Sequence, residues 1–220
     1  MRLAILFIAP PEKDFDWDPK AVAGANRFIK RAWNIVWQLS DGAVSGDVDP
    51  KSLKGLGAEL FRTLHGMGVK ATSDFDRGQF NTAISAAMEI VNAASKYLNE
   101  TPAVERNHEL DFRVAHDVVA MLAPICPHWA EELFHEALHL TGSVYNEPWP
   151  AFDAELAKSD EVEIAVQIKG KVRGRITVAA DASDDEMAEA AKAAVADQLA
   201  GKDIKKVIVV KGRLVNIVAI

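Results

Sequence analysis

The sequence predicts an α+β protein in which an up-and-down helical bundle is followed by a small domain of ββαββ order. In the first 150 residues, apolar side chains recur at the three- and four-residue spacing of amphipathic helices. In the last sixty, short alternating runs flank glycine-centred turns, which is typical of β-hairpins. With 220 residues and 49% hydrophobic content, the chain is long enough to bury one or two cores. We expect a bundle at 18–150, a polar linker at 151–161 and the ββαββ domain at 162–220.

The first helix of the bundle has a clear start. Asp18 is expected to cap the helix, and Pro19 suits the first helical position. A broad apolar face follows up to residue 39, while Arg27, Lys30 and Arg31 fall mostly on the other side. Four more helices are expected at about 51–65, ending at Gly66 and Gly68, and at 75–97, 104–122 and 127–140.

The first hairpin spans residues 162–178. Side chains alternate along a strand, so the apolar positions 164, 166 and 168 must share a face with 172, 176 and 178. Pairing Ile168 with Val172 satisfies this and leaves a three-residue loop, 169–171. A two-residue loop would pair Ile168 with Lys171 and direct a charge toward the buried face. In the chosen register Gln167, Arg173 and Arg175 share the open face.

Basic residues gather around the turns of both hairpins. Lys169, Lys171, Arg173 and Arg175 lie at or beside the first turn, an arrangement that suits a phosphate backbone. Residues 207–210 and 214–218 form the second hairpin, with Lys211 and Arg213 flanking Gly212. The alternative is that lysine and glycine are simply common in exposed turns.

One helix is expected between the hairpins. Ser183 is its predicted N-cap, Glu186 completes a capping box, and Gly201 suits its C-terminal end.

The charge distribution separates the two parts of the chain. The net charge is −7, but residues 1–161 carry 15 basic and 24 acidic side chains (−9), whereas 162–220 carry 10 and 8 (+2). The single cysteine, Cys126, excludes an intramolecular disulfide, suits a reducing cytoplasm and is expected to be a small buried residue. No signal peptide or membrane span is predicted.

No catalytic or metal site is predicted. Glu132 with His135 and Glu136 with His139 have the Glu-x-x-His spacing of di-iron bundles. That chemistry needs the two pairs on different helices, and here one helix is expected to carry both. The residues also lack a nucleophile–base set and a phosphate-binding loop.

Several stretches resemble bacterial leucyl-tRNA synthetases over essentially the whole chain. Residues 1–17 are similar to the segment that follows the Lys-Met-Ser-Lys-Ser loop of that family. Three runs resemble helices of the class Ia anticodon-binding bundle: RFIKRAW at 27–33, FNTAI at 80–84 with Met88 and Glu89, and MLAPICPHWAEELF at 121–134. Isoleucyl, valyl and methionyl enzymes share these bundle motifs. The hairpins QIKGKVRGRI at 167–176 and KGRLVNIV at 211–218 single out the leucyl family.

The resemblance implies a C-terminal fragment of a leucine–tRNA ligase. Residues 1–17 would then be a remnant of the stem connecting to the catalytic domain, with 3–9 in a helix where the residues alone also allow a buried strand. The ATP-binding signatures of the family do not occur here, so we expect this fragment to be inactive, while ATP and Mg belong to the parent enzyme.

The implied partners are leucine tRNA and the N-terminal catalytic and editing domains of the same protein. The resemblance further implies a cytoplasmic monomer that binds no membrane. The expected tRNA-binding residues are Lys169, Lys171, Arg173, Arg175, Lys211, Arg213, Arg27, Lys30 and Arg31.

Two other classes remain open from the residues. One is a free-standing module that binds protein through its hairpins, and the other is a small-molecule-sensing ββαββ domain. A sensor should have an apolar pocket at its sheet edge, whereas a tRNA binder should lose affinity steeply as salt increases.

Overall fold

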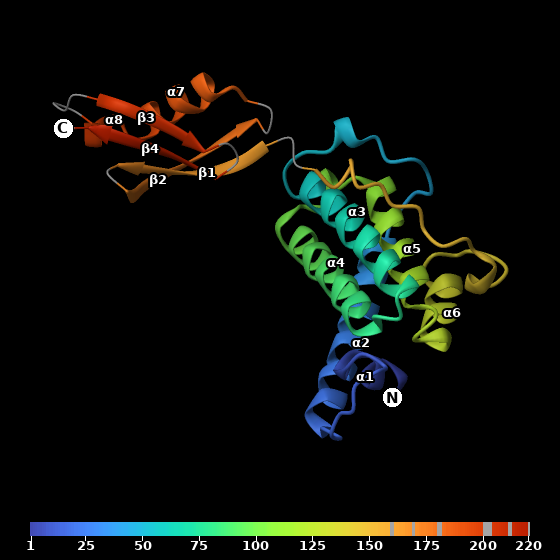
Figure 1. Ribbon diagram of the computed structural model, residues 1–220. Coiled ribbons are helices and arrows are strands. Elements are labelled where there is room, and N and C mark those ends of the chain that lie inside the picture. Colours follow the sequence, from blue (N-terminus) through green and yellow to red (C-terminus); the bar gives the residue numbers. More distant parts are fainter. Residues whose placement is uncertain (159–160, 169, 180–181, 200–203, 211–212, 220) are drawn as a thin grey trace. The chain divides into compact units, whose positions relative to one another are not determined.

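The structure, a computed structural model, describes residues 1–158, 161–168, 170–179, 182–199, 204–210 and 213–219. The chain divides into two compact units, Met1–Lys158 and Ser159–Ile220 (Figure 1). The predicted α+β architecture is confirmed, since the first unit is helical and the second contains a four-stranded sheet. Among the described residues, no helix combines the length and apolarity needed to cross a bilayer.

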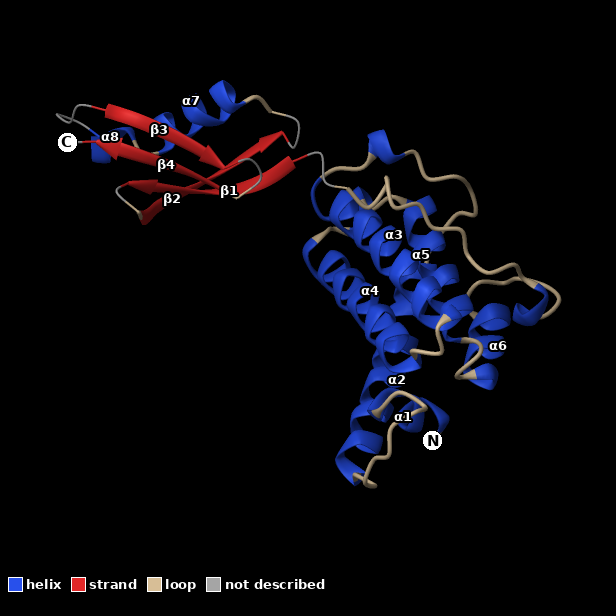
Figure 2. Cartoon of the chain, in the orientation of Figure 1, coloured by secondary structure: helices blue, strands red, loops and turns tan. Residues whose placement is uncertain are grey.

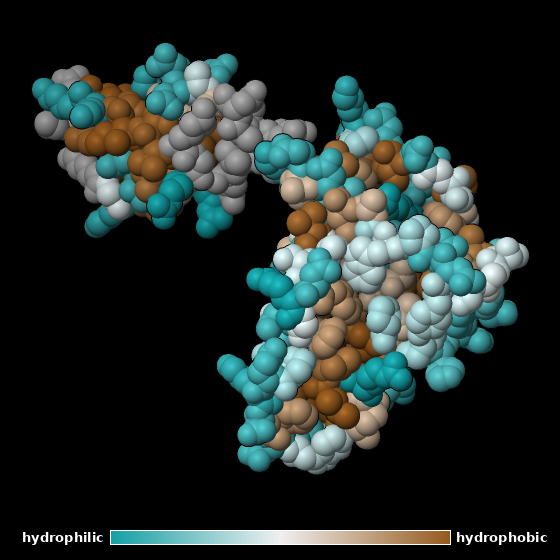
Figure 3. All heavy atoms as spheres, turned by 45° about the vertical axis from the view of Figure 1, so that its right-hand side comes forward, coloured by the Kyte–Doolittle hydropathy of each residue, from teal (hydrophilic) through white to brown (hydrophobic). Residues whose placement is uncertain are grey.

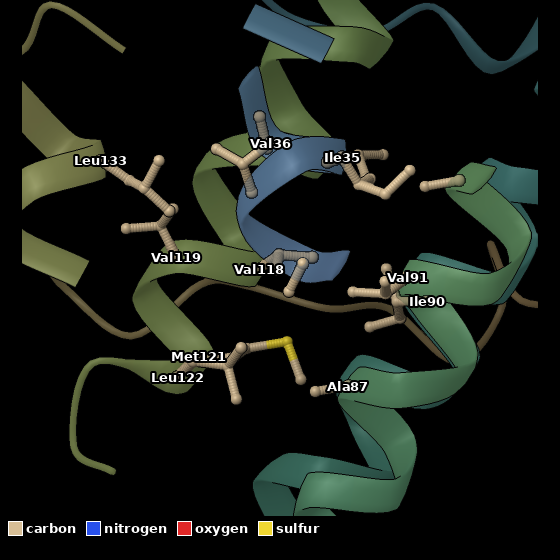
Figure 4. Packing of buried hydrophobic residues seen from close by; sticks show 14 of the residues in the cluster. Ile35, Val36, Ala87, Ile90, Val91, Val118, Val119, Met121, Leu122 and Leu133 are labelled. Carbon is tan, nitrogen blue, oxygen red and sulfur yellow. The ribbon is translucent and has the colours of Figure 1, made fainter. Parts of the chain in front are cut away.

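The first unit is a helical bundle around one hydrophobic core. Its helices are α1 (Arg2–Ile8), α2 (Pro19–Ser40), α3 (Gly55–Asp76), α4 (Phe80–Glu100), α5 (His108–Leu122) and α6 (Pro127–Glu136). Short 3-10 turns occur at Pro50–Ser52, Ala103–Glu105 and Val144–Asn146. Figure 4 shows the core where Val36 of α2 and Val91 of α4 lie near Val118 and Met121 of α5. Burial of this apolar surface provides the main driving force for folding.

The N-terminal helices follow their sequence signals. Residues 2–8 form a helix, as the resemblance implied, and Leu3 and Ala4 are buried in the bundle core. The carboxylate of Asp18 accepts a hydrogen bond of 2.8 Å from the Lys20 N–H, so the predicted cap of α2 is confirmed.

The predicted end of the second helix is wrong. Helix α3 begins at Gly55 and continues through Gly66 and Gly68 to Asp76. These glycines permit a close approach: a Cβ at position 68 would lie 2.2 Å from the ring of Phe152, and one at position 66 would lie 3.4 Å from the Cβ of Ala157. The helix therefore tolerates two glycines because another segment packs directly on its backbone.

That other segment comprises residues 149–158, which we call the docked segment. The Trp149 indole N–H donates to the Thr72 hydroxyl (2.8 Å), and the Arg113 guanidinium donates to the carbonyl of residue 151 (2.6 Å). The N–H of Asp153 donates to Nδ1 of His65 (3.0 Å). Residues 151–158, expected to be linker, thus belong to the first unit, where they form a loop without helix or strand (Figure 2).

Other helix boundaries also differ from the expectations, among them the start of α3 at residue 55 and the end of α4 at residue 100. Because the chain turns at Gly78 (φ +71°), α4 begins at residue 80. Helix α5 begins at residue 108, after Asn107 caps it by accepting from the Leu110 N–H (2.7 Å). Helix α6 ends at residue 136, and His139 has a φ of +54°. The two Glu-x-x-His pairs therefore do not share one helix, contrary to the expectation.

The second unit has the predicted ββαββ order with one additional short helix. Its elements are β1 (Glu161–Ile168), β2 (Lys171–Ala179), α7 (Asp184–Ala194), α8 (Ala196–Leu199), β3 (Ile204–Val210) and β4 (Leu214–Ala219). The strand order is β2-β1-β4-β3, with the central pair β1 and β4 parallel. The Ser183–Glu186 capping box is confirmed. Gly201, the expected helix end, lies outside the described residues.

Helix α7 covers one face of this sheet. Met187 and Ala191 of α7 are fully buried in one cluster with apolar side chains of three strands: Ile164, Val166, Ile168, Ile176, Val215 and Ile217. The opposite face of the sheet, which we call the open face, carries the alternate residues.

Candidate nucleic-acid interface

The turn of the first hairpin differs from the prediction. Ile168 pairs with Lys171, leaving a two-residue turn, and Gln167 pairs with Val172. Val166 then pairs with Gly174, so a β-bulge absorbs one residue of β2. The predicted three-residue loop is wrong. Beyond the bulge the predicted register is confirmed, as in the pair of residues 164 and 176.

The bulge explains how a two-residue turn is compatible with a buried apolar face. Lys171 is the first residue of β2, where its side chain is exposed, so no charge is buried. Past the bulge, the alternation of β2 again directs Ile176 toward the core. As a consequence of the bulge, Val172, which was expected on the buried face, is 57% exposed.

Two rows of side chains cross the open face. Cross-strand pairing aligns Val172, Gln167, Asn216 and Ile208 in one row, and Arg175, Ala165, Leu214 and Val210 in the next. These two rows contain no acidic residue, and Ile208 and Val210 are each about two-fifths exposed. Hydrophobic side chains also gather on the visible face of this unit in Figure 3. These two rows thus combine amides, aliphatic groups and a cation.

The described cations of the first hairpin lie along the edge strand β2. Lys171, Arg173 and Arg175 are all exposed, and Arg173 is the residue at the bulge. Gln198 donates a hydrogen bond of 3.3 Å to the Arg173 carbonyl, which anchors the backbone at that point. Lys169 lies outside the described residues. The described cations therefore form a basic edge.

Arg213, which directly precedes β4, lies toward the opposite end of the sheet from the end of β1. Arg213 is exposed, and its N–H donates to the Val210 carbonyl (3.0 Å) just before β4 starts. β1 and β4 are parallel, with Ile168 beside Ile217 and Ala165 beside Leu214. The end of β1 and the start of β4 therefore lie toward opposite ends of the sheet. Lys211 is outside the described residues. The structure thus separates Arg213 from Lys171 at the turn end of β2.

The three predicted cations of the bundle lie on α2 and are exposed. Arg31 donates a hydrogen bond of 2.6 Å to the Asn92 side chain on α4. Arg27 and Lys30 form no ion pair or side-chain hydrogen bond with the part of the chain that the structure describes. Two of the three charges are therefore available to an anionic partner.

Three tryptophans next to these cations were not predicted as site residues. The sequence assigned Trp33 to the apolar face of its helix, but its ring is only half-buried and lies near Trp37 and Trp129. The i, i+4 spacing of Trp33 and Trp37 beside Lys30 was the available sequence signal. No sequence signal indicated that Trp129 of α6 would lie near Trp33.

Buried titratable groups belong to the scaffold of the bundle. Burial raises the pKa of Asp111 to about 6, although hydrogen bonding from Tyr97 and the charge of Arg106 oppose this. Burial also raises the pKa of Tyr97 to about 12 and raises that of the half-buried Cys126 thiol. Over the described ranges, no three His, Cys, Asp or Glu side chains are grouped to hold a metal ion.

Comparison with known proteins identifies the family. Residues 58–189, more than half of the chain, match the sequence model described as "Anticodon-binding domain of tRNA ligase". The chain belongs to this family. The leucine–tRNA ligase of Fervidobacterium nodosum is 44% identical over 99% of the chain, and those of Thermotoga maritima and Geotalea daltonii are 40% and 41% identical over the same share.

The match covers only part of each relative. The chain spans about a quarter of their length (26%, 27% and 26%), in the C-terminal portion. The crystal structure of a ternary complex of Agrobacterium radiobacter K84 LeuRS with tRNA and LeuAMS has a TM-score of 0.73 and 22% identity, covering 99% of this chain and 28% of that one. This likeness supports the fold, and the identity of the relatives confirms the resemblance to leucyl-tRNA synthetases.

Proposed function

We propose that this chain is the tRNA-binding part of a leucine–tRNA ligase. The observation that carries the proposal is 44% identity to such a ligase over nearly the whole chain. The parent protein would attach leucine to its tRNA with ATP and Mg and edit mischarged tRNA in the cytoplasm. Its catalytic and editing domains would be covalent partners of this chain, with residues 1–17 in the connecting stem, 18–150 in the bundle and 162–220 in the module on the tRNA.

The basic edge of β2 supports binding to the tRNA backbone. Lys171 and Arg173 are exposed and lie close together on one strand, so both can approach neighbouring phosphates without burying charge. Contacts of this kind position a nucleic acid without reading its bases. Each unit also has exposed cations of its own, Arg213 in the second and those of α2 in the first, which suit contact with a polyanion.

The experiment is a titration of leucine tRNA with this chain at 50 and 200 mM salt. Each phosphate contact contributes roughly 0.9 to the slope of log K against log salt. The double substitution Lys171→Ala with Arg173→Ala should therefore weaken binding and lower the slope by about 2. Folding should be unchanged, because both side chains are exposed.

The control is Lys192→Ala, which removes a partly exposed cation of the same unit. Lys192 lies on α7, on the other side of the sheet from the open face, and pairs with Glu189 (2.7 Å). Its removal should leave tRNA affinity and salt slope unchanged. Binding that does not respond to salt, or a double variant that binds like the unaltered chain, would contradict the proposal.

A further inference from the structure

An aromatic groove lies on the bundle surface between α2 and α6. The ring centroids of Trp33 and Trp37 are 6.4 Å apart, and those of Trp33 and Trp129 are 6.5 Å apart. Trp37 is 40% exposed, and the other two rings are half-buried. The groove has a volume of about 350 Å³ and is lined by Ile29, Lys30, Trp33, Asn34 and Trp129. It is large enough for one small planar group.

The groove has a basic rim. Lys30 lines it directly, and Arg27 lies one helical turn earlier on the same stripe of α2 as Lys30 and Asn34. Neither cation is paired within the described residues, whereas Arg31 is bonded to Asn92 on α4. No carboxylate lines the groove. An apolar protein segment would cover the rings but leave these two charges unpaired, so charge complementarity favours an anionic occupant.

We propose that this groove binds one unstacked nucleotide of the tRNA. Its base would stack on the exposed indole surface, and its phosphate would lie against Lys30 and Arg27. Aromatic platforms beside cations bind bases in this way because every base has a π-face. The nucleotide must come from a loop or an end, since a paired, stacked base does not offer a free face. The amide of Asn34 is available to the edge of the base.

This inference rests on the proposed function and adds to it a base-binding contact on the bundle, distinct from the phosphate contacts on β2. It predicts that the bundle binds single-stranded RNA by itself, independently of the basic edge. Alanine substitution at a stacking contact reduces affinity by about ten-fold when the lost stacking is near 1.4 kcal/mol.

The test uses the whole chain with leucine tRNA and with an unstructured RNA pentamer. Tryptophan fluorescence and RNA anisotropy are measured for Trp33→Leu, which keeps apolar volume but removes the π-face, and for Lys30→Ala. Circular dichroism establishes that each variant is folded. Trp37→Ala, at an exposed position, serves as a second stacking variant in case Trp33→Leu does not fold.

The matched controls are Trp17→Ala and Lys51→Ala. Trp17 is 56% exposed and lies before α2, and Lys51 is exposed in a 3-10 turn, so each removes the same kind of side chain outside the groove. We expect saturable quenching by both RNAs, and about ten-fold weaker binding in the groove variants only.

The outcomes separate the inference from the proposed function. If the unaltered chain binds tRNA but the folded groove variants bind equally well, the inference is wrong and the proposed function stands. If the chain does not bind tRNA, the proposed function fails. The titration with the RNA pentamer then shows whether the groove binds a nucleotide: fluorescence quenching that disappears in Trp33→Leu supports such a site. Absence of quenching by the pentamer overturns it.

Discussion

The packing of Phe152 on Gly68 gives the sharpest prediction about stability. The ring of Phe152 occupies the space where a Cβ on residue 68 would lie, with three ring carbons at 2.2–2.5 Å from that position. An alanine at 68 is compatible with the helical backbone but not with the docked ring. Gly68→Ala should therefore displace the docked segment instead of simply improving the helix.

The magnitude follows from opposing contributions. Replacing glycine by alanine within a helix stabilises by about 1 kcal/mol. Full burial of a phenylalanine contributes about 1.5–3 kcal/mol, and the half-buried Phe152 somewhat less. The hydrogen bonds from Arg113 to residue 151 and from Asp153 to His65 each contribute about 1 kcal/mol and loosen with the ring. The expected net loss of unfolding free energy is about 1–2 kcal/mol.

Urea unfolding followed by far-UV circular dichroism measures this loss, because most helix is in the first unit. Gly66→Ala is the matched control: its Cβ would meet the Cβ of Ala157 at 3.4 Å, an ordinary contact, so it should be neutral or stabilise by up to about 1 kcal/mol. In a Phe152→Ala background the conflict is absent, and Gly68→Ala should change sign and stabilise. If Gly68→Ala stabilises the unaltered chain as well, the steric reasoning is refuted.

Three further predictions concern buried groups and activity. Burial lowers the pKa of His65, whose neutral ring accepts a hydrogen bond from the Asp153 N–H. The stabilisation of the folded state by this neutral ring is present above about pH 6.5 and is lost as pH falls through the lowered pKa. His65→Gln should therefore flatten the dependence of the urea midpoint on pH between about 7 and 5. The pKa of Asp111 is raised to about 6, so the folded state binds its proton more tightly and stability falls as pH rises from about 4 through 6. Asp111→Asn should then stabilise at pH 7 by on the order of 1 kcal/mol and have little effect at pH 4, and an unchanged melting temperature at both pH values would contradict this. The chain alone should catalyse no leucine-dependent pyrophosphate exchange, and measurable turnover by the purified chain would refute its assignment as a binding fragment.

The aromatic groove between α2 and α6 shows where sequence reasoning stops. Arg27 and Lys30 were predicted from their positions on the polar side of a helix, and both are exposed. Trp33 was assigned to the core because indole is hydrophobic, and a helical pattern cannot tell a buried edge from a groove wall. The wall is completed by Trp129, almost a hundred residues away, and no local pattern reports that contact.

Several signals that act within a few residues predicted the structure correctly. The cap at Asp18, the capping box of Ser183 and Glu186, and the alternation that yields ββαββ each depend on neighbouring backbone groups or on a fixed side-chain period. The hairpin motifs also carried the correct family. These features are local, and therefore nearby residues are enough to specify them.

Contacts between distant segments decided the rest. Glycines 66 and 68 looked like a helix end, but α3 continues because Phe152 and Ala157 pack on it and their contacts outweigh the low helix propensity of glycine. The turn is one residue shorter than predicted, and the bulge at Arg173 compensates for it. The register beyond the bulge is kept because it buries residues 164, 166 and 176 on the α7 side, and this burial fixes the register more strongly than the turn does. The parallel pairing of β1 with β4 then places Lys171 and Arg213 toward opposite ends of the sheet. Each of these outcomes depends on free energy from surfaces that meet only after the chain has folded, so no local sequence pattern could predict them.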